Sequence, residues 1–313
     1  MRTVTVPVLV ALGLFGLSAA QAADLDYGVL RGPEYEPAVP LIDWSGIYFG
    51  AHAGYTSASH SYGGVFQPAL ADYFRRTVIE SEFNVSSLLT TGSRRVDGTS
   101  FGAFAGYNFQ FDETVLGFEV DYTRFGKQSS SYNDIARLMT TSSGMLESVY
   151  VAGTSTTKIE DYGTIRGRAG YAMGNFLPFV TGGFAIGRAN ITDAVTVQNY
   201  GYNQTTYLAN QQLTSGSPAY VTNHGYAAFN QNYPGNRSTP AGQGVQTVPS
   251  APTALAAVAK TKTVGGITLG AGLEYALTQN LLLRAEYQYV LFNDFDGHKA
   301  NLNTVRGGAA VKF

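Results

Sequence analysis

The chain has 313 residues, among which 20 lysines and arginines and 22 aspartates and glutamates give a formal net charge of −2. This near-neutral charge argues against a nucleic-acid partner. The absence of cysteine excludes disulfide bonds as a source of stability. Charged residues make up only 13%, and the chain is rich in glycine, tyrosine and phenylalanine, with 37, 21 and 18 copies. This composition favours strands with close backbone contacts and belts of aromatic side chains.

The first 22 residues have the pattern of a cleaved signal peptide. Arg2 supplies a positive charge, residues 4–17 form an apolar run, and residues 20–22 read Ala-Gln-Ala, so we expect cleavage after Ala22. The alternative is a membrane helix, but the apolar run is near the lower length limit for one and the cleavage site follows at once. No later stretch is long and apolar enough for such a helix. Residues 23–43 contain Pro33, Pro37 and Pro40 without periodicity, which predicts an extended lead-in or a plain linker.

From Trp44 onward the chain alternates apolar and polar residues with the period of a β-strand. In the first such segment Ile47, Phe49 and Tyr55 share one face, and His52 lies on the other. We predict eight strands, near 44–55, 99–110, 114–122, 158–172, 177–189, 263–277, 280–291 and 304–313. A soluble antiparallel hairpin with one wet face is an alternative explanation for any one pair of these segments.

The connections between these strands alternate in length. Three are short, around 111–113, 174–175 and 278–280, and four are long, at 56–98, 126–157, 190–262 and 293–303. Short turns on one side and long loops on the other are typical of a transmembrane barrel, and closure leaves no unpaired edge in lipid. The sequence therefore predicts an all-β fold over 44–313: an eight-stranded antiparallel transmembrane up-and-down β-barrel with short periplasmic turns and long extracellular loops.

Aromatic residues at the two ends of the strands support this prediction, because membrane barrels carry two aromatic girdles. The short-turn end of the outer face is expected to carry Tyr107, Phe109, Tyr171, Tyr275 and Phe313, and the long-loop end Tyr55, Phe101, Tyr122 and Tyr289.

The same alternation sends charged residues into the lumen. They are Glu119, Asp121, Arg166, Arg168, Glu274, Arg284, Glu286 and Arg306, with Lys312 expected to stay solvated at a rim. An eight-stranded interior is just wide enough for side chains to fill, and unpaired charge in it is costly. We therefore predict a bonded network and a closed lumen, the alternative being a small pore.

Four runs resemble the small opacity-like outer-membrane proteins, in particular the alphaproteobacterial major surface antigens and their haemin-binding relatives. They are DWSGIYFGAHAGY at 43–55, GAFAGYN at 102–108, IRGRAGY at 165–171 and the ending VKF at 311–313. The resemblance implies residence in the bacterial outer membrane, with lipid, lipopolysaccharide and the assembly machinery as partners. It also implies a terminal assembly signal in Gly308, Val311 and Phe313, although Gly307 departs from the usual polar residue before it.

The resemblance to haemin-binding proteins directs attention to the histidines. His60, His224 and His298 are predicted in or beside long loops and are weak candidates for axial haem ligands. No paired metal spacing supports this, so we interpret these residues as solvated loop histidines and expect no metal site. Ser59 and Ser61 flank His60, but adjacency in sequence does not define a catalytic geometry, and no enzyme is predicted.

The stretch 190–262 is nearly uncharged and rich in asparagine, glutamine, tyrosine, serine and threonine. A structureless loop of this size tends to be functional or disordered, and its composition suits adaptable contacts. The sequence predicts a structural and surface-antigen role, with adhesion to a host or cell-surface ligand through the loops. A haemin receptor or small porin is the alternative, and a lipid-modifying enzyme a weaker one.

Overall fold

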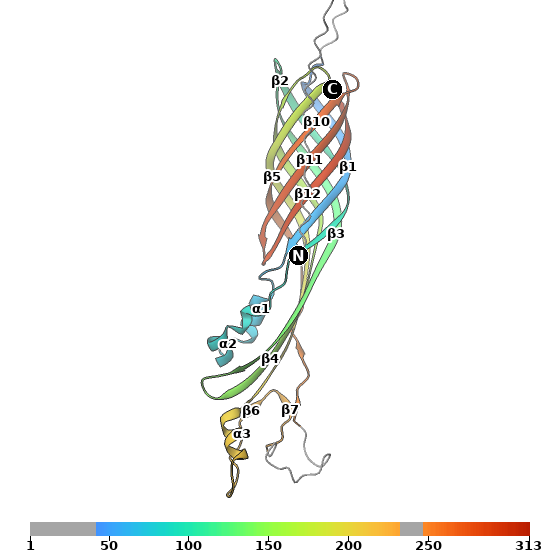
Figure 1. The fold of residues 1–313 in the computed structure, drawn as a ribbon. Coiled ribbons are helices and arrows are strands. Elements are labelled where there is room, and N and C mark those ends of the chain that lie inside the picture. Colours follow the sequence, from blue (N-terminus) through green and yellow to red (C-terminus); the bar gives the residue numbers. More distant parts are fainter. Residues whose placement is uncertain (1–41, 232–246) are drawn as a thin grey trace, which may run out of the picture. The chain divides into compact units, whose positions relative to one another are not determined.

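Eight antiparallel strands close into a ring in the computed structural model, which describes residues 42–231 and 247–313 (Figure 1). Within the ring, β1 pairs with both β2 and β12, and β5 pairs with β10. The strands are β1 (Gly46–Ser61), β2 (Arg94–Phe111), β3 (Thr114–Thr140), β4 (Met145–Tyr171), β5 (Phe176–Asn203), β10 (Val258–Ala276), β11 (Leu281–Phe295) and β12 (His298–Lys312). The predicted eight-stranded barrel is thus confirmed. The expected signal peptide, and the lead-in as far as residue 41, lie outside the described residues.

Shorter elements fill two of the connections. Between β1 and β2 lie α1 (Gln67–Tyr73), α2 (Val78–Phe83) and the 3₁₀ turn η1 (Val85–Ser87). Between β5 and β10 lie α3 (Gln204–Gln211), β6 (Asn223–His224), β7 (Tyr226–Ala228), β8 (Val248–Pro249) and β9 (Thr253–Ala254). Among residues 42–231 and 247–313, no helix is both long enough and apolar enough to cross a membrane.

The outer face of the ring is apolar, and the strand alternation explains why. On β1, Phe49 and Tyr55 are 55% and 58% exposed, whereas Tyr48, the residue before Phe49 and on the opposite face, is fully buried. The same reversal recurs around the ring, with exposed Phe101, Phe118, Val120, Ile165, Val180, Phe184, Leu269, Leu283, Tyr287 and Val305. A continuous apolar belt of this kind requires a lipid environment.

The three short turns lie where the sequence predicts them, at 112–113, 172–175 and 277–280. For two of the four connections predicted to be long, however, the prediction is wrong, because both are short. β3 and β4 continue until only 141–144 separates them, and β11 and β12 are joined by Asp296 and Gly297 alone. Both of these residues have positive φ, 58° and 80°, as a two-residue hairpin turn requires.

The expected loop 190–262 is also shorter than predicted. β5 runs to Asn203 and β10 begins at Val258, so the connection is 204–257. The polar residues 190–203 become a strand because β4 supplies a partner along their whole length, from Lys158↔Asn190 to Met145↔Asn203.

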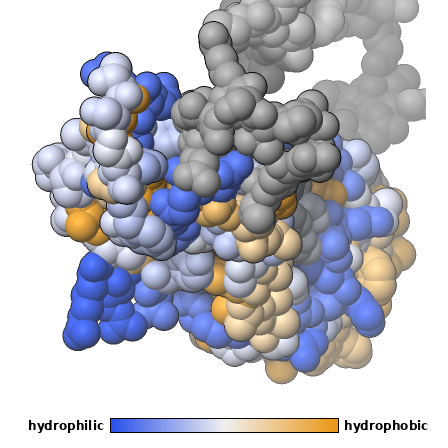
Figure 2. Space-filling model, turned by 90° about the horizontal axis from the view of Figure 1, so that it is seen from below, coloured by the Kyte–Doolittle hydropathy of each residue, from blue (hydrophilic) through white to orange (hydrophobic). Residues whose placement is uncertain are grey.

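Beyond the ring, three strands continue without the others. β2 pairs with β3 only as far as Arg124, whereas β3, β4 and β5 stay paired to their far ends. We call this part, residues 62–93, 127–156, 194–231 and 247–257, the head. It has its own apolar core, in which Leu70 of α1, Ile79 of α2 and Phe74, which follows α1, pack with the sheet. The sheet residues are Val149, Val151, Val195 and Val197. The coloured part of the surface in Figure 2 is hydrophilic to neutral over most of its area, with smaller hydrophobic patches.

Candidate functional site

The lumen holds a buried network of ion pairs at mid-height. Arg166 contacts the carboxylates of Glu119 and Glu286, and all three side chains are inaccessible to solvent. Arg284 places Nη1 2.7 Å from Glu119 Oε2 and Nη2 2.6 Å from Glu274 Oε1. Arginine suits such positions because its fork can hold two carboxylates at once.

The network continues around the lumen. Arg306 Nη1 lies 2.5 Å from Asp121 Oδ2, and Arg306 Nη2 lies 3.0 Å from Glu286 Oε2. Arg168 contacts Glu274. The structure therefore joins all eight predicted lumen residues, four arginines and four acids, in one connected set.

Two further side chains, which the sequence analysis did not assign to this network, complete it. Tyr48 donates its hydroxyl to Glu119 Oε2 at 2.8 Å, and His52 Nε2 lies 3.1 Å from Asp121 Oδ2. Both residues fall on inward-facing positions of β1. Strand parity had already placed His52 on this face, and the same parity could have found Tyr48. Aromatic faces also receive guanidinium groups: Arg284 Cζ lies 4.0 Å from the centre of the Phe104 ring.

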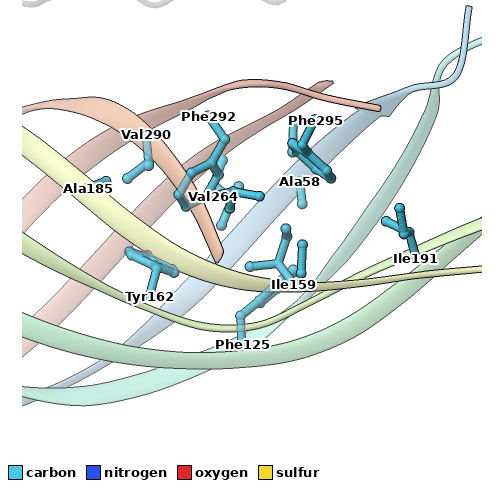
Figure 3. Close-up of a cluster of buried hydrophobic side chains, with 13 residues drawn as sticks. Ala58, Phe125, Ile159, Tyr162, Ala185, Ile191, Val264, Val290, Phe292 and Phe295 are labelled. Carbon is cyan, nitrogen blue, oxygen red and sulfur yellow. The ribbon is translucent and has the colours of Figure 1, made fainter. Parts of the chain in front are cut away.

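Apolar layers close the lumen on both sides of the charges. Towards the head, Phe292, Val264 and Ile159 belong to a cluster that points into the space between the strands (Figure 3). Towards the short turns, Trp44 and Leu282 are buried in a second cluster. The sequence analysis identified only the charged positions inside the barrel and missed these layers.

Lys312 corrects one expectation at the short-turn end. It was predicted to stay solvated at the rim, but it is only 6% exposed and donates to the backbone carbonyl of Asp43. Ile42, near the end of the lead-in, and Trp44, the first residue of the barrel, are buried at the same end. This start of the described chain covers the lysine.

Two of the three haem candidates are buried rather than solvated. His60 and His298 are each 1% exposed, because β1 and β12 continue past the predicted strand ends and keep both residues on the inward face. His60 Nδ1 lies 3.1 Å from Ser129 Oγ, whereas His298 Nδ1 and Nε2 lie 2.7 Å from Thr157 Oγ1 and 3.2 Å from Asp193 Oδ2. The prediction of solvated loop histidines is therefore wrong for this pair.

Neither of these buried histidines is accessible as an axial haem ligand, since each is only 1% exposed. Both ring nitrogens of His298 are engaged, and its ring is flanked by the rings of Tyr62 and Phe295 at centroid distances of 5.6 and 5.7 Å. His224 lies elsewhere, on β6, where its Nε2 is 2.9 Å from both oxygens of Glu147. This hydrogen bond raises the pKa of His224 above its usual value. In the described part of the chain, no group of three histidine, cysteine or acidic side chains could hold a metal ion.

The three residues of the expected assembly signal lie along the seam between β12 and β1. Phe313 donates its backbone N–H to Ile47 O at 2.9 Å, is 75% exposed, and has its ring 6.3 Å from that of Phe49. Val311 is also exposed, at 46%. At Gly308 an added Cβ would lie 2.6 Å from Ala51 O, so the close approach of β1 requires a glycine there.

A family model described as "Outer membrane protein beta-barrel domain" matches residues 8–313. The 31 kDa outer-membrane immunogenic protein of Brucella melitensis biotype 1 is 28% identical over 319 residues, covering 98% of each chain. The 25 kDa outer-membrane immunogenic protein of Brucella ovis is 24% identical over 316 residues, covering 100% of each. Among solved structures, Neisserial surface protein A has 15% identity and a TM-score of 0.30, covering 86% of this chain and 98% of its own. Ail of Yersinia pestis has 10% identity and a TM-score of 0.28, covering 86% and 99%.

Proposed function

Because the chain belongs to the family of outer-membrane β-barrel domains, we propose that it is a surface antigen that displays its head outside the cell on a closed barrel. The protein resides in the bacterial outer membrane. Curated relatives of similar length are named as immunogenic proteins, which supports the antigenic role. They are not named as enzymes, and we propose no catalytic activity for this chain.

The filled lumen is the observation that carries this function. The ion pairs at mid-height lie between two apolar layers, and Arg166, Glu119 and Glu274 have no accessible side-chain surface. A diffusion pore needs a water-filled path, and an eight-stranded interior packed in this way leaves none for solutes. The small-porin alternative is therefore not favoured. A haemin receptor is not favoured either, since His60 and His298 are each 1% exposed and His224 Nε2 is held by Glu147.

The head supplies the surface for recognition. Its strands extend beyond the lipid-facing belt, and α1 and α2 give it a core of its own. On β3, Tyr132 and Leu138 of the head are 55% and 67% exposed. We propose that this surface is what antibodies and a host or cell-surface ligand meet, while lipid and lipopolysaccharide surround the belt. The assembly machinery is proposed to act on Gly308, Val311 and Phe313.

Orientation can be tested by labelling, because the natural chain has no cysteine. Leu138→Cys places a thiol in the head, and Glu113→Cys places one at the turn between β2 and β3, where the residue is exposed. We expect a membrane-impermeant maleimide to label the first variant on intact cells and the second only after permeabilisation. Labelling of Glu113→Cys alone on intact cells would overturn the proposed orientation.

Closure can be tested with the unaltered protein in planar bilayers. The charge network and the apolar layers predict little or no steady conductance. Large, stable channels would refute the closed lumen while leaving the location of the head to the labelling experiment.

A further inference from the structure

One edge of the sheet in the head is open. β3 pairs with β2 only as far as Arg124, and beyond that residue the one strand paired with it in the described part of the chain is β4. Over residues 132–138 every residue except Ile135 is exposed, including Ala136, whose small side chain covers little of the backbone. The opposite edge of the sheet differs, because β5 there pairs with β6, β9 and β10. The β3 edge is therefore accessible to another strand.

An open edge presents backbone N–H and C=O groups that can pair with a further strand. Proteins often protect such an edge with a proline or a bulge. Residues 132–138 contain no proline, and the irregularity in the β3–β4 register lies before them, at 124–127. The edge also carries Tyr132 and Leu138 on its exposed face. A strand that fits here must offer apolar partners for these two side chains.

A second copy of the chain offers such a strand. Two identical antiparallel strands in one sheet are related by a two-fold axis perpendicular to the sheet. This rotation keeps each residue on its own face, so two residues that oppose each other must share a face. Tyr132 and Leu138 share a face, because they are an even number of positions apart. A pair centred on Ile135 sets Tyr132 of each copy against Leu138 of the other.

Charge disfavours three neighbouring centres for this pair. Centred on Asp134 or on Arg137, the pair would set that charged side chain against its own copy, which is destabilising. Centred on Ala136, it would set both charges against large apolar side chains. In the pair centred on Ile135, Asp134 faces Ala136. Arg137 faces Asn133, so neither charge meets its like or an apolar side chain of large size.

The direction of β3 decides where the second copy must be. β3 begins at a short turn of the barrel and ends in the head, so an antiparallel partner has its barrel at the opposite end. Two copies in one membrane would instead have parallel β3 strands, related by rotation about the membrane normal. That rotation sets N–H against N–H at equal heights, and no regular ladder forms. Antiparallel pairing of two β3 edges therefore joins two facing membranes.

We propose that the β3 edge at 132–138 pairs with the same edge of a second copy in a facing membrane, so that the head links cells that carry this protein. The inference names a partner for the recognition role of the head, and it rests on the proposed exposure of the head outside the cell. One such pair is a small contact and is weak by itself. Many copies on each surface bind together, which raises the strength of the link.

Pairing is tested by disulfide trapping, because the natural chain has no cysteine. Tyr132→Cys and Leu138→Cys chains are refolded separately in detergent, mixed and mildly oxidised. Opposed residues have Cα atoms about 4.5–5.5 Å apart, within reach of a disulfide, whereas two copies of either position lie roughly 20 Å apart. We expect at least tenfold more covalent dimer from the mixture than from either variant alone. Leu138→Cys mixed with Leu208→Cys, an exposed position on α3, measures random collision and should give no such excess.

The link between membranes is tested by the clustering of lipid vesicles that carry the refolded protein, measured by turbidity. The polar head cannot cross the hydrocarbon core, so insertion from outside leaves it on the outer surface. Vesicles with Tyr132→Lys alone, or with Leu138→Glu alone, should cluster about tenfold less than vesicles with the natural chain, because each pair then sets a charge against an apolar side chain twice. Mixing the two kinds of vesicle should restore clustering, since the new lysine faces the new glutamate. Leu208→Lys should leave clustering unchanged.

Three results would overturn the proposal. They are no excess of covalent dimer in the cysteine mixture over the collision control, no clustering of vesicles that carry the natural chain, and no recovery when the two charged variants are mixed. The labelling of Leu138→Cys on intact cells tests the surface role separately. A labelled head without covalent dimer would keep that role and remove the second copy as its partner.

Discussion

Arg166 is the position at which the lumen network can be tested most directly. Arg166→Met removes a guanidinium that contacts Glu119 and Glu286 and replaces it with an apolar side chain. The substitution leaves the network with one acid in excess, in a part of the lumen that water does not reach. We expect loss of stability without loss of fold.

The magnitude follows from the contacts that remain. Removing one partner of a buried pair costs about 3–5 kcal/mol. Glu119 keeps Arg284 at 2.7 Å, and Glu286 keeps Arg306 at 3.0 Å, so neither acid is left alone. We therefore expect the lower end, about 3 kcal/mol, which is roughly a hundredfold in the unfolding equilibrium.

The assay is equilibrium urea unfolding of the protein reconstituted in lipid vesicles. The single tryptophan, Trp44, is fully buried at the short-turn end and reports unfolding through its fluorescence. Arg137→Met is the matched control, because Arg137 is exposed in the head and its guanidinium donates to the adjacent Ala136 O. We expect a change within about 0.5 kcal/mol. The double variant Arg166→Met/Glu286→Met restores charge balance and should lose less than the sum of its single changes. A single variant as stable as the Arg137 control would refute the reasoning.

Three further predictions concern the seam, the long connection and the head. Deleting Phe313 should lower the yield of heat-modifiable, folded protein in the outer membrane, because the deletion removes the final bond to β1 and an interfacial ring. Replacing 204–257 by a short Gly-Ser linker should leave the barrel folded in detergent by circular dichroism, whereas replacing 190–262 should not, because that deletion removes paired segments of β5 and β10. The Glu147 contact raises the pKa of His224, so its stabilising effect is full below the unfolded value near 6.5 and is lost as pH rises through the folded pKa. Limited proteolysis of the head should accordingly be slower at pH 6 than at pH 8.

Each of these has a discriminating control. Phe313→Tyr keeps an interfacial ring and should retain folded yield; equal yields for the deletion and the natural chain would contradict an assembly role. Equal folding of both loop replacements would mean that the strand extensions contribute nothing to the barrel. His224→Gln should abolish the pH dependence of proteolysis, and its persistence in that variant would assign the effect to another group.

The strands inside the lipid belt were predictable because lipid imposes a strict rule on them. Outward-facing residues such as Phe49 and Leu269 must be apolar, whereas inward-facing positions such as those of Arg166 and Glu286 can be charged. Parity alone thus identified the eight lumen charges. Which arginine meets which acid was not predictable, because those contacts depend on the stagger of strands around the ring.

The head escaped prediction because water replaces lipid there. Residues 127–134 read Lys-Gln-Ser-Ser-Ser-Tyr-Asn-Asp, a run whose strand conformation is set by pairing with β4 and not by any apolar face. Some sequence patterns did indicate secondary structure in the head. Val149 and Val151 alternate across Tyr150, and Thr77 three residues before Glu80 is a helix-start pattern whose side chain accepts from Glu80 N at 3.3 Å. Extending the parity of β1 would have placed His60 inside.

The extension of β3 past its last partner on β2 also sets how far the head reaches above the membrane surface. From Arg124 to Thr140 the strand has a contour length of roughly 50 Å at about 3.3 Å per residue. The polar headgroup zone of a bilayer is only about 5–8 Å deep on each side. The distance of the 141–144 turn from the membrane surface is therefore set by the number of paired residues in β3 and β4. Removing two residues from β3 and their two partners from β4 shortens it by about 7 Å while every remaining side chain keeps its face.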